Sequence, residues 1–79
     1  MANEMQGTYW HRGDSFPYRA TYEVNLAEQS IAIDCTFETH GTQRQLNICV
    51  FASTPDLEQS APHIAGRRIE AHIDRMVSA

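Results

Sequence analysis

The alternation of apolar and polar residues between Tyr18 and Leu26 constrains the fold more than any other feature of the sequence. Apolar side chains stand at every second position of this run, and the positions between them are mostly polar. A period of two is that of a β-strand with one buried and one solvated face. The run from Ile31 to Glu38 repeats the pattern, and only residues 27–30 separate the two runs. We therefore predict two antiparallel strands joined by a hairpin loop.

A third strand is predicted from about Arg44 to Ala52. A turn at residues 39–42 precedes it, where Gly41 supplies the positive φ that tight connections need. The alternation is less regular here because apolar residues occur on both faces. One face carries Leu46, Ile48 and Val50.

A C-terminal helix follows the strands. Thr54, Pro55 and Asp56 have the form of an N-cap, a proline at the first helical position and an acid in the first turn. Pro62 removes a helical hydrogen bond, so we expect either a kink there or a main helix that is capped by Ser60.

The helix has one apolar face. At 100° per residue, a narrow arc contains Ala65, Ile69, Ile73 and Met76. Gly66 flanks this arc, and we expect it to allow close approach of the helix to a strand. These elements predict an α+β fold, with a three-stranded antiparallel meander packed by one C-terminal helix in two layers.

Residues 1–16 are less regular. Their large apolar members are Met5, Tyr9, Trp10 and Phe16. The segment is expected to be either an additional N-terminal edge strand or a disordered lead-in, with Trp10 on the outer face of the sheet. Residues 17–79 are expected to form a single β-β-β-α domain, since 79 residues leave no room for a second one.

Composition excludes several classes of protein. The net charge of -4 argues against a surface of bulk positive charge, and two cysteines are too few for a disulfide framework. The N-terminus lacks the pattern of an export signal, and no apolar run reaches the roughly 20 residues of a membrane helix. A reduced, soluble, cytoplasmic protein is expected.

Metal binding and catalysis are not predicted. The residues that could bind a metal are Cys35, Cys49, His11, His40, His63 and His72, and none has a recognised ligand spacing. Cys35 and Cys49 are expected on opposite faces of the sheet. A domain this small offers little concavity for a catalytic site, so we expect no enzyme activity and no cofactor.

Two groups of residues are candidates for partner binding. The first is the arginine-bearing helix, where Arg68, His72 and Arg75 share one flank, while Arg67 lies with His63, Glu70 and Asp74 on the other and outer side. Contact with an anion or an acidic partner is one interpretation of Arg67, Arg68, His72 and Arg75, and a solvated helix back with i,i+3 charge pairs is the other. The second group is the aromatic set Tyr9, Trp10 and Phe51, because Trp and Tyr dominate the hot spots of protein interfaces. The other interpretation is that Trp10 folds over Phe51 and closes a small additional core.

Two resemblances concern the C-terminal part. The string Val50–Leu57, followed by Ala65–Ile69 and Ile73-Asp74, resembles small uncharacterised bacterial β-β-β-α domains, and the likeness covers roughly residues 18–76. The element order also resembles that of double-stranded-RNA-binding domains, without their lysine-rich start to the last helix. The resemblances imply a fold and no activity.

We therefore expect a small non-enzymatic protein-interaction or accessory module. Its partner would be another protein, or a second copy bound through a strand edge. The alternative is a nucleic-acid-binding module that uses the arginines of the C-terminal helix. No membrane partner is expected.

Overall fold

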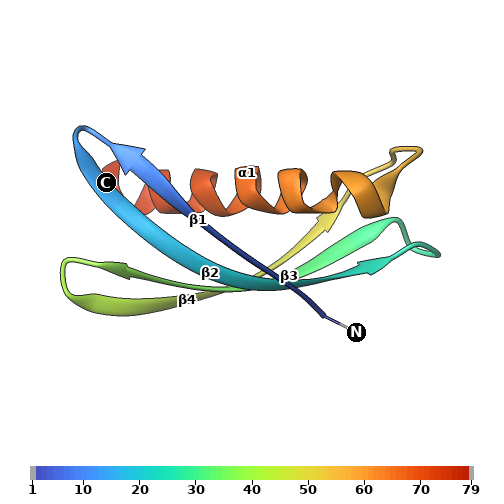
Figure 1. The fold of residues 1–79 in the computed structure, drawn as a ribbon, viewed down its shortest axis with the longest axis horizontal. Coiled ribbons are helices and arrows are strands. Elements are labelled where there is room, and N and C mark those ends of the chain that lie inside the picture. The colour runs from blue at the N-terminus through green and yellow to red at the C-terminus, as the bar shows by residue number, and fades with distance from the viewer. Residues whose placement is uncertain (1, 79) are drawn as a thin grey trace.

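A computed structural model of the chain describes residues 2–78. A four-stranded antiparallel sheet in the order β1-β2-β3-β4 carries one helix, α1, on one face (Figure 1). The bounds of the elements are Asn3–His11 for β1, Asp14–Asn25 for β2, Ser30–Thr39 for β3, Thr42–Phe51 for β4 and Leu57–Ser78 for α1. The predicted α+β class and two-layer arrangement are confirmed, and the sheet has four strands.

The N-terminal segment forms the additional edge strand. It pairs with β2 along its whole length, from Asn3↔Tyr22 to His11↔Asp14. A two-residue turn links the strands, and both its residues, Arg12 and Gly13, have positive φ, as type I′ hairpin turns require. The expected domain boundary between residues 16 and 17 therefore falls inside β2. The disordered alternative is wrong for Asn3–His11, whose weak alternation hid the strand.

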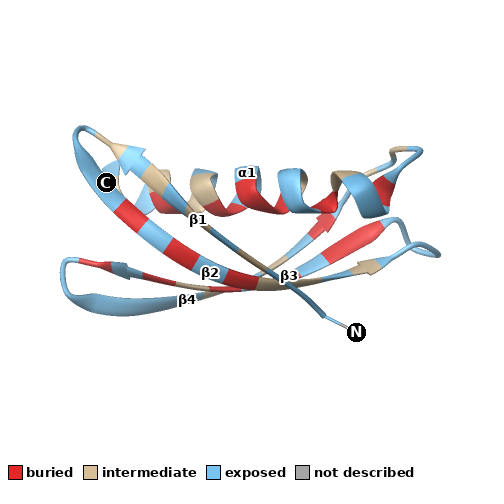
Figure 2. Cartoon of the chain, viewed as in Figure 1, coloured by how far each residue is buried: buried red, intermediate tan, exposed pale blue. Residues whose placement is uncertain are grey.

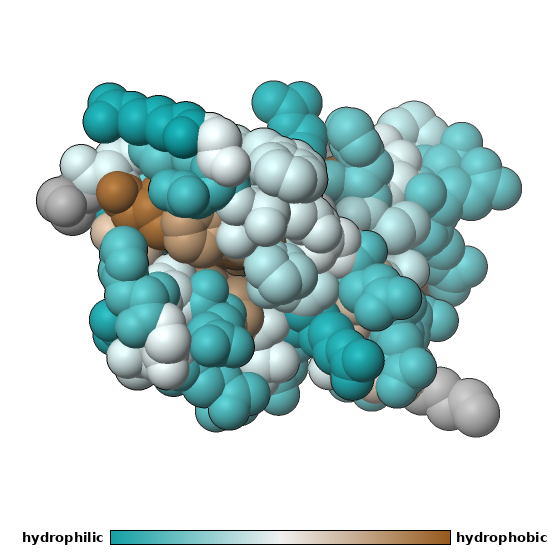
Figure 3. All heavy atoms as spheres, turned by 60° about the vertical axis from the view of Figure 1, so that its left-hand side comes forward, coloured by the Kyte–Doolittle hydropathy of each residue, from teal (hydrophilic) through white to brown (hydrophobic). Residues whose placement is uncertain are grey.

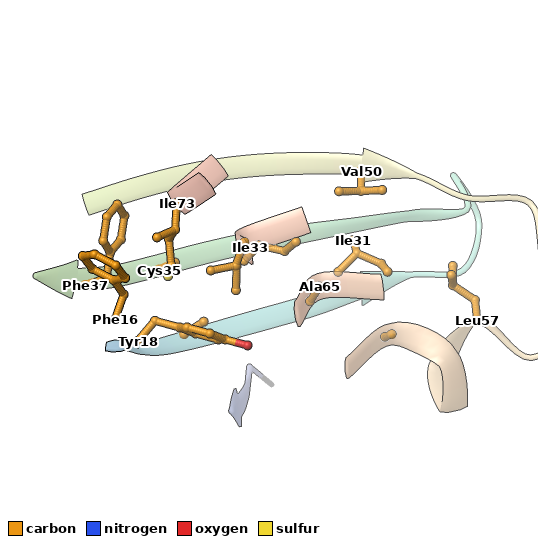
Figure 4. Close-up of a cluster of buried hydrophobic side chains, with 13 residues drawn as sticks. Phe16, Tyr18, Ile31, Ile33, Cys35, Phe37, Val50, Leu57, Ala65 and Ile73 are labelled. Carbon is orange, nitrogen blue, oxygen red and sulfur yellow. The ribbon is translucent and has the colours of Figure 1, made fainter. Parts of the chain in front are cut away.

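One face of the sheet is buried and the other is solvated (Figure 2). The predicted alternation is confirmed for β2 and β3, except at Leu26, which follows the end of β2 and is exposed. Leu46, Ile48 and Val50 of β4 share the face toward α1. Cys35 is buried and Cys49 is exposed, as their opposite parity predicted. The core lies between this face and α1 (Figure 4), and its buried apolar members are Phe16, Tyr18, Ala20, Ile31, Ile33, Cys35, Phe37, Val50, Leu57, Ala61, Ala65, Ile69 and Ile73.

Two glycines set how closely β1, β2 and α1 pack. A Cβ at Gly7 would lie 2.6 Å from the Tyr18 Oη and 2.7 Å from its Cζ, so the tyrosine ring occupies the space above this glycine. Gly66 is buried in α1, and a Cβ there would lie 3.5 Å from Met5 Cε. The expected close approach of the helix at Gly66 is therefore directed at the β1 side of the sheet.

The two ends of α1 differ from the prediction. The Asp56 carbonyl accepts a hydrogen bond from the Ser60 N–H at 2.9 Å, so Asp56, rather than Thr54 or Ser60, has the N-cap position. The helix continues through Pro62, whose side chain is exposed. Met76 was expected on the buried face but is 43% exposed, because the last helical residue of the core is Ile73.

Candidate functional site

The acidic flank of α1 contacts the β1 side of the sheet. The Tyr9 hydroxyl donates a hydrogen bond of 2.7 Å to Asp74 Oδ1, and the Tyr18 hydroxyl donates one of 3.0 Å to Glu70 Oε2. His11 Nδ1 lies 3.4 Å from the same Asp74 oxygen. Glu70 and Asp74 lie on the flank opposite Arg68, as helical spacing predicted, but they are half-buried rather than outer residues, because they attach α1 to β1 and β2.

These contacts perturb the two tyrosines in one direction. The pKa of Tyr9 is raised, first by its hydrogen bond to Asp74. Burial, followed by the hydrogen bond to Glu70, raises the pKa of Tyr18 to about 12. Both phenols therefore remain protonated donors at neutral pH, so the cluster holds the fold together and offers no proton acceptor other than the carboxylates and His11.

The basic flank of α1 lies on the opposite side of the helix. At 100° per residue, Arg68, His72 and Arg75 project away from Asp74 and toward β4, whereas Arg67 projects to the solvated back. Both Arg68 and Arg75 are exposed, and His72 is half-buried. The structure thus groups three of the four predicted helix residues and separates Arg67 from them. Within residues 2–78 these arginines form no salt bridge with a carboxylate.

Strand β4 extends beyond the area that α1 covers. Strands are about 4.8 Å apart and a helix is about 10 Å wide, so one helix covers two or three of four strands. Here α1 packs on β1, β2 and β3, and β4 packs chiefly on β3. Consequently Leu46 and Ile48 are only half-buried, whereas Cys35 and Ile33, their partners across the ladder, are buried.

One further arginine joins this surface. Arg44 shares the helix-facing side of β4 with Leu46 and Ile48, and its Nε donates a hydrogen bond of 3.2 Å to Thr39 Oγ1. The sequence contains the signal for it, because Arg44 has the same parity as Leu46, but the irregular alternation of this strand obscured it. We call the set Arg44, Leu46, Ile48, Arg68, His72 and Arg75 the β4–α1 surface. Figure 3 shows hydrophobic surface recessed between hydrophilic side chains at the end of the molecule where α1 ends.

The backbone of β4 has a free hydrogen-bonding edge. The Ala52 N–H donates to the Gln29 carbonyl at 2.9 Å, which continues the β3–β4 register by one step. Because hydrogen-bonding directions alternate along a strand, the even-numbered residues of β4 bond to β3. The residues whose N–H and C=O groups point away from the sheet are Gln43, Gln45, Asn47, Cys49 and Phe51.

The predicted aromatic set is not brought together. Tyr9 faces α1, whereas its neighbour Trp10 is on the outer face and 68% exposed. Phe51 is also on the outer face but pairs with Ser30, at the end of the sheet opposite to the Trp10↔Ser15 pair. A single aromatic surface made of Tyr9, Trp10 and Phe51 is therefore wrong as a geometric expectation.

The outer face of the sheet is polar. An open depression on it is lined mainly by Glu4, Gln6, Arg19, Thr21, Asp34, Thr36 and Gln45. Gln45 Nε2 donates a hydrogen bond of 3.2 Å to Asp34 Oδ1 across the strands. Amides, hydroxyls and charges of both signs are typical of the solvated face of an antiparallel sheet.

The cysteines and histidines do not converge in the described part of the chain. Residues 2–78 contain no group of three or more metal-binding side chains. Burial raises the pKa of Cys35 to about 11, so this thiol is a poor nucleophile.

Comparisons with known proteins leave the chain without an assigned family. No family model, curated protein or solved structure matches it. In residues 2–78 no helix is long and apolar enough to cross a membrane.

Proposed function

We propose that the protein is a small non-enzymatic binding module that takes an extended segment of another protein along the free edge of β4. The observation that carries this proposal is the combination of an unpaired ten-residue edge strand with a helix-facing side that α1 leaves half-exposed. In strand addition, main-chain hydrogen bonds supply affinity and alternate side chains supply specificity.

The edge at β4 lacks most of the features that protect edge strands. Natural edges are blunted by proline, by several charges, by bulges or by a covering element. Strand β4 contains no proline, continues in unbroken register with β3, and carries one charged residue, Arg44.

The opposite edge, β1, is a poorer receptor. Its helix-facing residue Tyr9 is bonded to α1, and α1 packs directly on this strand. A partner strand at β1 would lie beside Met5 and Tyr9, which are half-buried but already pack against α1 at Gly66 and Asp74. This asymmetry favours β4 as the binding edge.

The test blocks the edge without breaking the sheet. The N–H of Asn47 points away from β3, so Asn47→Pro removes no ladder hydrogen bond but removes the central donor of the edge. Asn47→Ala keeps the N–H and serves as the matched control. Unchanged circular dichroism of both variants would establish that the sheet remains folded.

The probe is a displayed library of random segments of ten residues, the length of β4. We expect segments selected on the wild-type protein to bind Asn47→Ala equally and to lose most of their affinity for folded Asn47→Pro. Selected segments that bind the proline variant as well, or a selection that enriches none, would contradict binding at this edge.

A further inference from the structure

We infer that the segment bound at β4 is apolar in its N-terminal half and acidic in its C-terminal half, and that it lies antiparallel to β4 under the basic flank of α1. This inference rests on the proposed function and adds the chemistry of the partner. It is carried by the β4–α1 surface, where half-buried apolar residues adjoin arginines that have no carboxylate partner within residues 2–78.

The order of chemistry along β4 follows from the register. Ile48, Leu46 and Arg44 follow one another on the helix-facing side, opposite Ile33, Cys35 and Phe37 of β3. Figure 4 shows Ile73 over the end of the sheet that holds Cys35 and Phe37, with Ala65 toward the Ile31 end. Arg75 follows Ile73 by two residues and therefore lies toward the Arg44 end of β4, so that end carries two arginines.

An added antiparallel strand places its own residues directly opposite these side chains. Its helix-facing residues meet Ile48 first, Leu46 next and Arg44 last, from its N-terminus to its C-terminus. Apolar residues at the first two positions would cover Ile48 and Leu46, and a carboxylate at the third would pair with Arg44 under Arg75. Residues at the alternate positions would lie beside Gln45 and Asn47 on the solvated face, where polar side chains fit.

Charge favours an acidic segment over a second copy of this chain as the partner at the β4 edge. In a symmetric β4–β4 pair, the basic flanks of the two helices would face each other across the two-fold axis. Arg68, His72 and Arg75 of one copy would meet the same residues of the other, and like charges across an interface are unfavourable. An acidic segment instead supplies the missing carboxylates.

The experiment uses a labelled peptide with threonine at every outward position. The helix-facing positions carry valine opposite Ile48 and Leu46, and glutamate opposite Arg44 and Thr42. The control peptide has lysine in place of each glutamate. Fluorescence anisotropy measures the affinity of both peptides for the full chain.

Adjacent arginines provide a matched pair of variants. Arg68→Glu and Arg67→Glu change the net charge equally, but only Arg68 belongs to the β4–α1 surface. We expect the acidic peptide to bind the wild type more tightly than the lysine peptide and to weaken with added salt. Arg68→Glu should weaken it by roughly fivefold, and Arg67→Glu by less than about twofold.

Several outcomes would overturn this inference. Equal binding of the two peptides, equal effects of the two arginine variants, or no binding of the acidic peptide would each do so. A wild-type dimer that Asn47→Pro dissociates in sedimentation would assign the edge to a second copy. Binding of oligouridine that Arg68→Glu abolishes, without peptide binding, would assign the basic flank to nucleic acid. If library segments still require the Asn47 edge in any of these cases, the proposed function stands and only the partner chemistry fails.

Discussion

Replacing Gly7 with alanine tests the packing of β1 against the rest of the fold. The new Cβ would lie 2.6 Å from Tyr18 Oη and 2.7 Å from Tyr18 Cζ, closer than Cβ contacts occur. Tyr18 is 6% exposed and its hydroxyl donates to Glu70 at 3.0 Å, so the ring can move only by losing core contacts and this hydrogen bond. Gly7→Ala should therefore damage the fold through the tyrosine rather than through the backbone.

The expected loss can be estimated from its parts. Overpacking of this kind costs about 1–3 kcal/mol, and a weakened hydrogen bond to a carboxylate adds about 1 kcal/mol. The lower entropy of the unfolded alanine chain returns about 0.4–1 kcal/mol. The free energy of unfolding should fall by about 2–3 kcal/mol, which is a drop of about 2 M in the urea midpoint for a chain of this size.

Gly66→Ala is the matched control in the urea titration. Its Cβ would be in ordinary contact, 3.5 Å from Met5 Cε and 3.6 Å from Tyr18 Oη, and alanine favours a helix interior by about 1 kcal/mol. This variant should equal or exceed the wild type in stability. A Gly7→Ala variant as stable as the wild type, or an equal loss of stability in the two variants, would contradict this packing of Tyr18 over Gly7.

The remaining predictions concern groups with defined environments. The pKa of Tyr18 is raised from 10.0 to about 12, so its contribution to stability is complete below pH 10 and is lost as the pH rises toward 12. Urea titrations across this range should show a decline in stability that Tyr18→Phe reduces. An equal decline in both proteins would show that Tyr18 is not its source. Asp74→Asn weakens the acceptor of the Tyr9 hydroxyl and should lower the midpoint in the same titration, so an unchanged midpoint would remove this contact from the forces that hold β1. A thiol reagent should modify one cysteine of the native protein, the exposed Cys49, and should reach the buried Cys35 only after unfolding; rapid modification of both would place Cys35 outside the core.

The sequence predicted the elements whose side chains alternate strongly, and it was least informative where they do not. Ile31 to Phe37 contains apolar residues at every inward position, and this pattern alone places the strand in the core. β1 lacks such a pattern because its central inward position is Gly7, which is small so that the Tyr18 ring can lie over it. When a side chain of the neighbouring strand fills the inward position of a strand, that strand cannot be recognised from its own alternation of apolar and polar residues.

The candidate site was predictable only in part for a similar reason. Helical spacing correctly grouped Arg68, His72 and Arg75, since it depends on one element alone. It could not show that Arg44 joins them, or that Phe51 is far from Trp10, because both depend on how strands pair across the sheet. Spacing also could not tell which flank of α1 faces which edge.

The position of α1 near β1 rather than β4 follows from two local features that act together. Gly66 and Gly7 reduce the bulk between α1 and the β1–β2 side, where Tyr18 and Met5 fill the space. Tyr9 and Tyr18 then donate hydrogen bonds to Asp74 and Glu70, which tie this flank of the helix to β1 and β2. Since the helix cannot span all four strands, each contact that draws it toward β1 also moves it away from β4. The interactions that stabilise one edge of the sheet are therefore the reason that the other edge, with its uncovered apolar side chains and unpaired backbone groups, is left open to a partner.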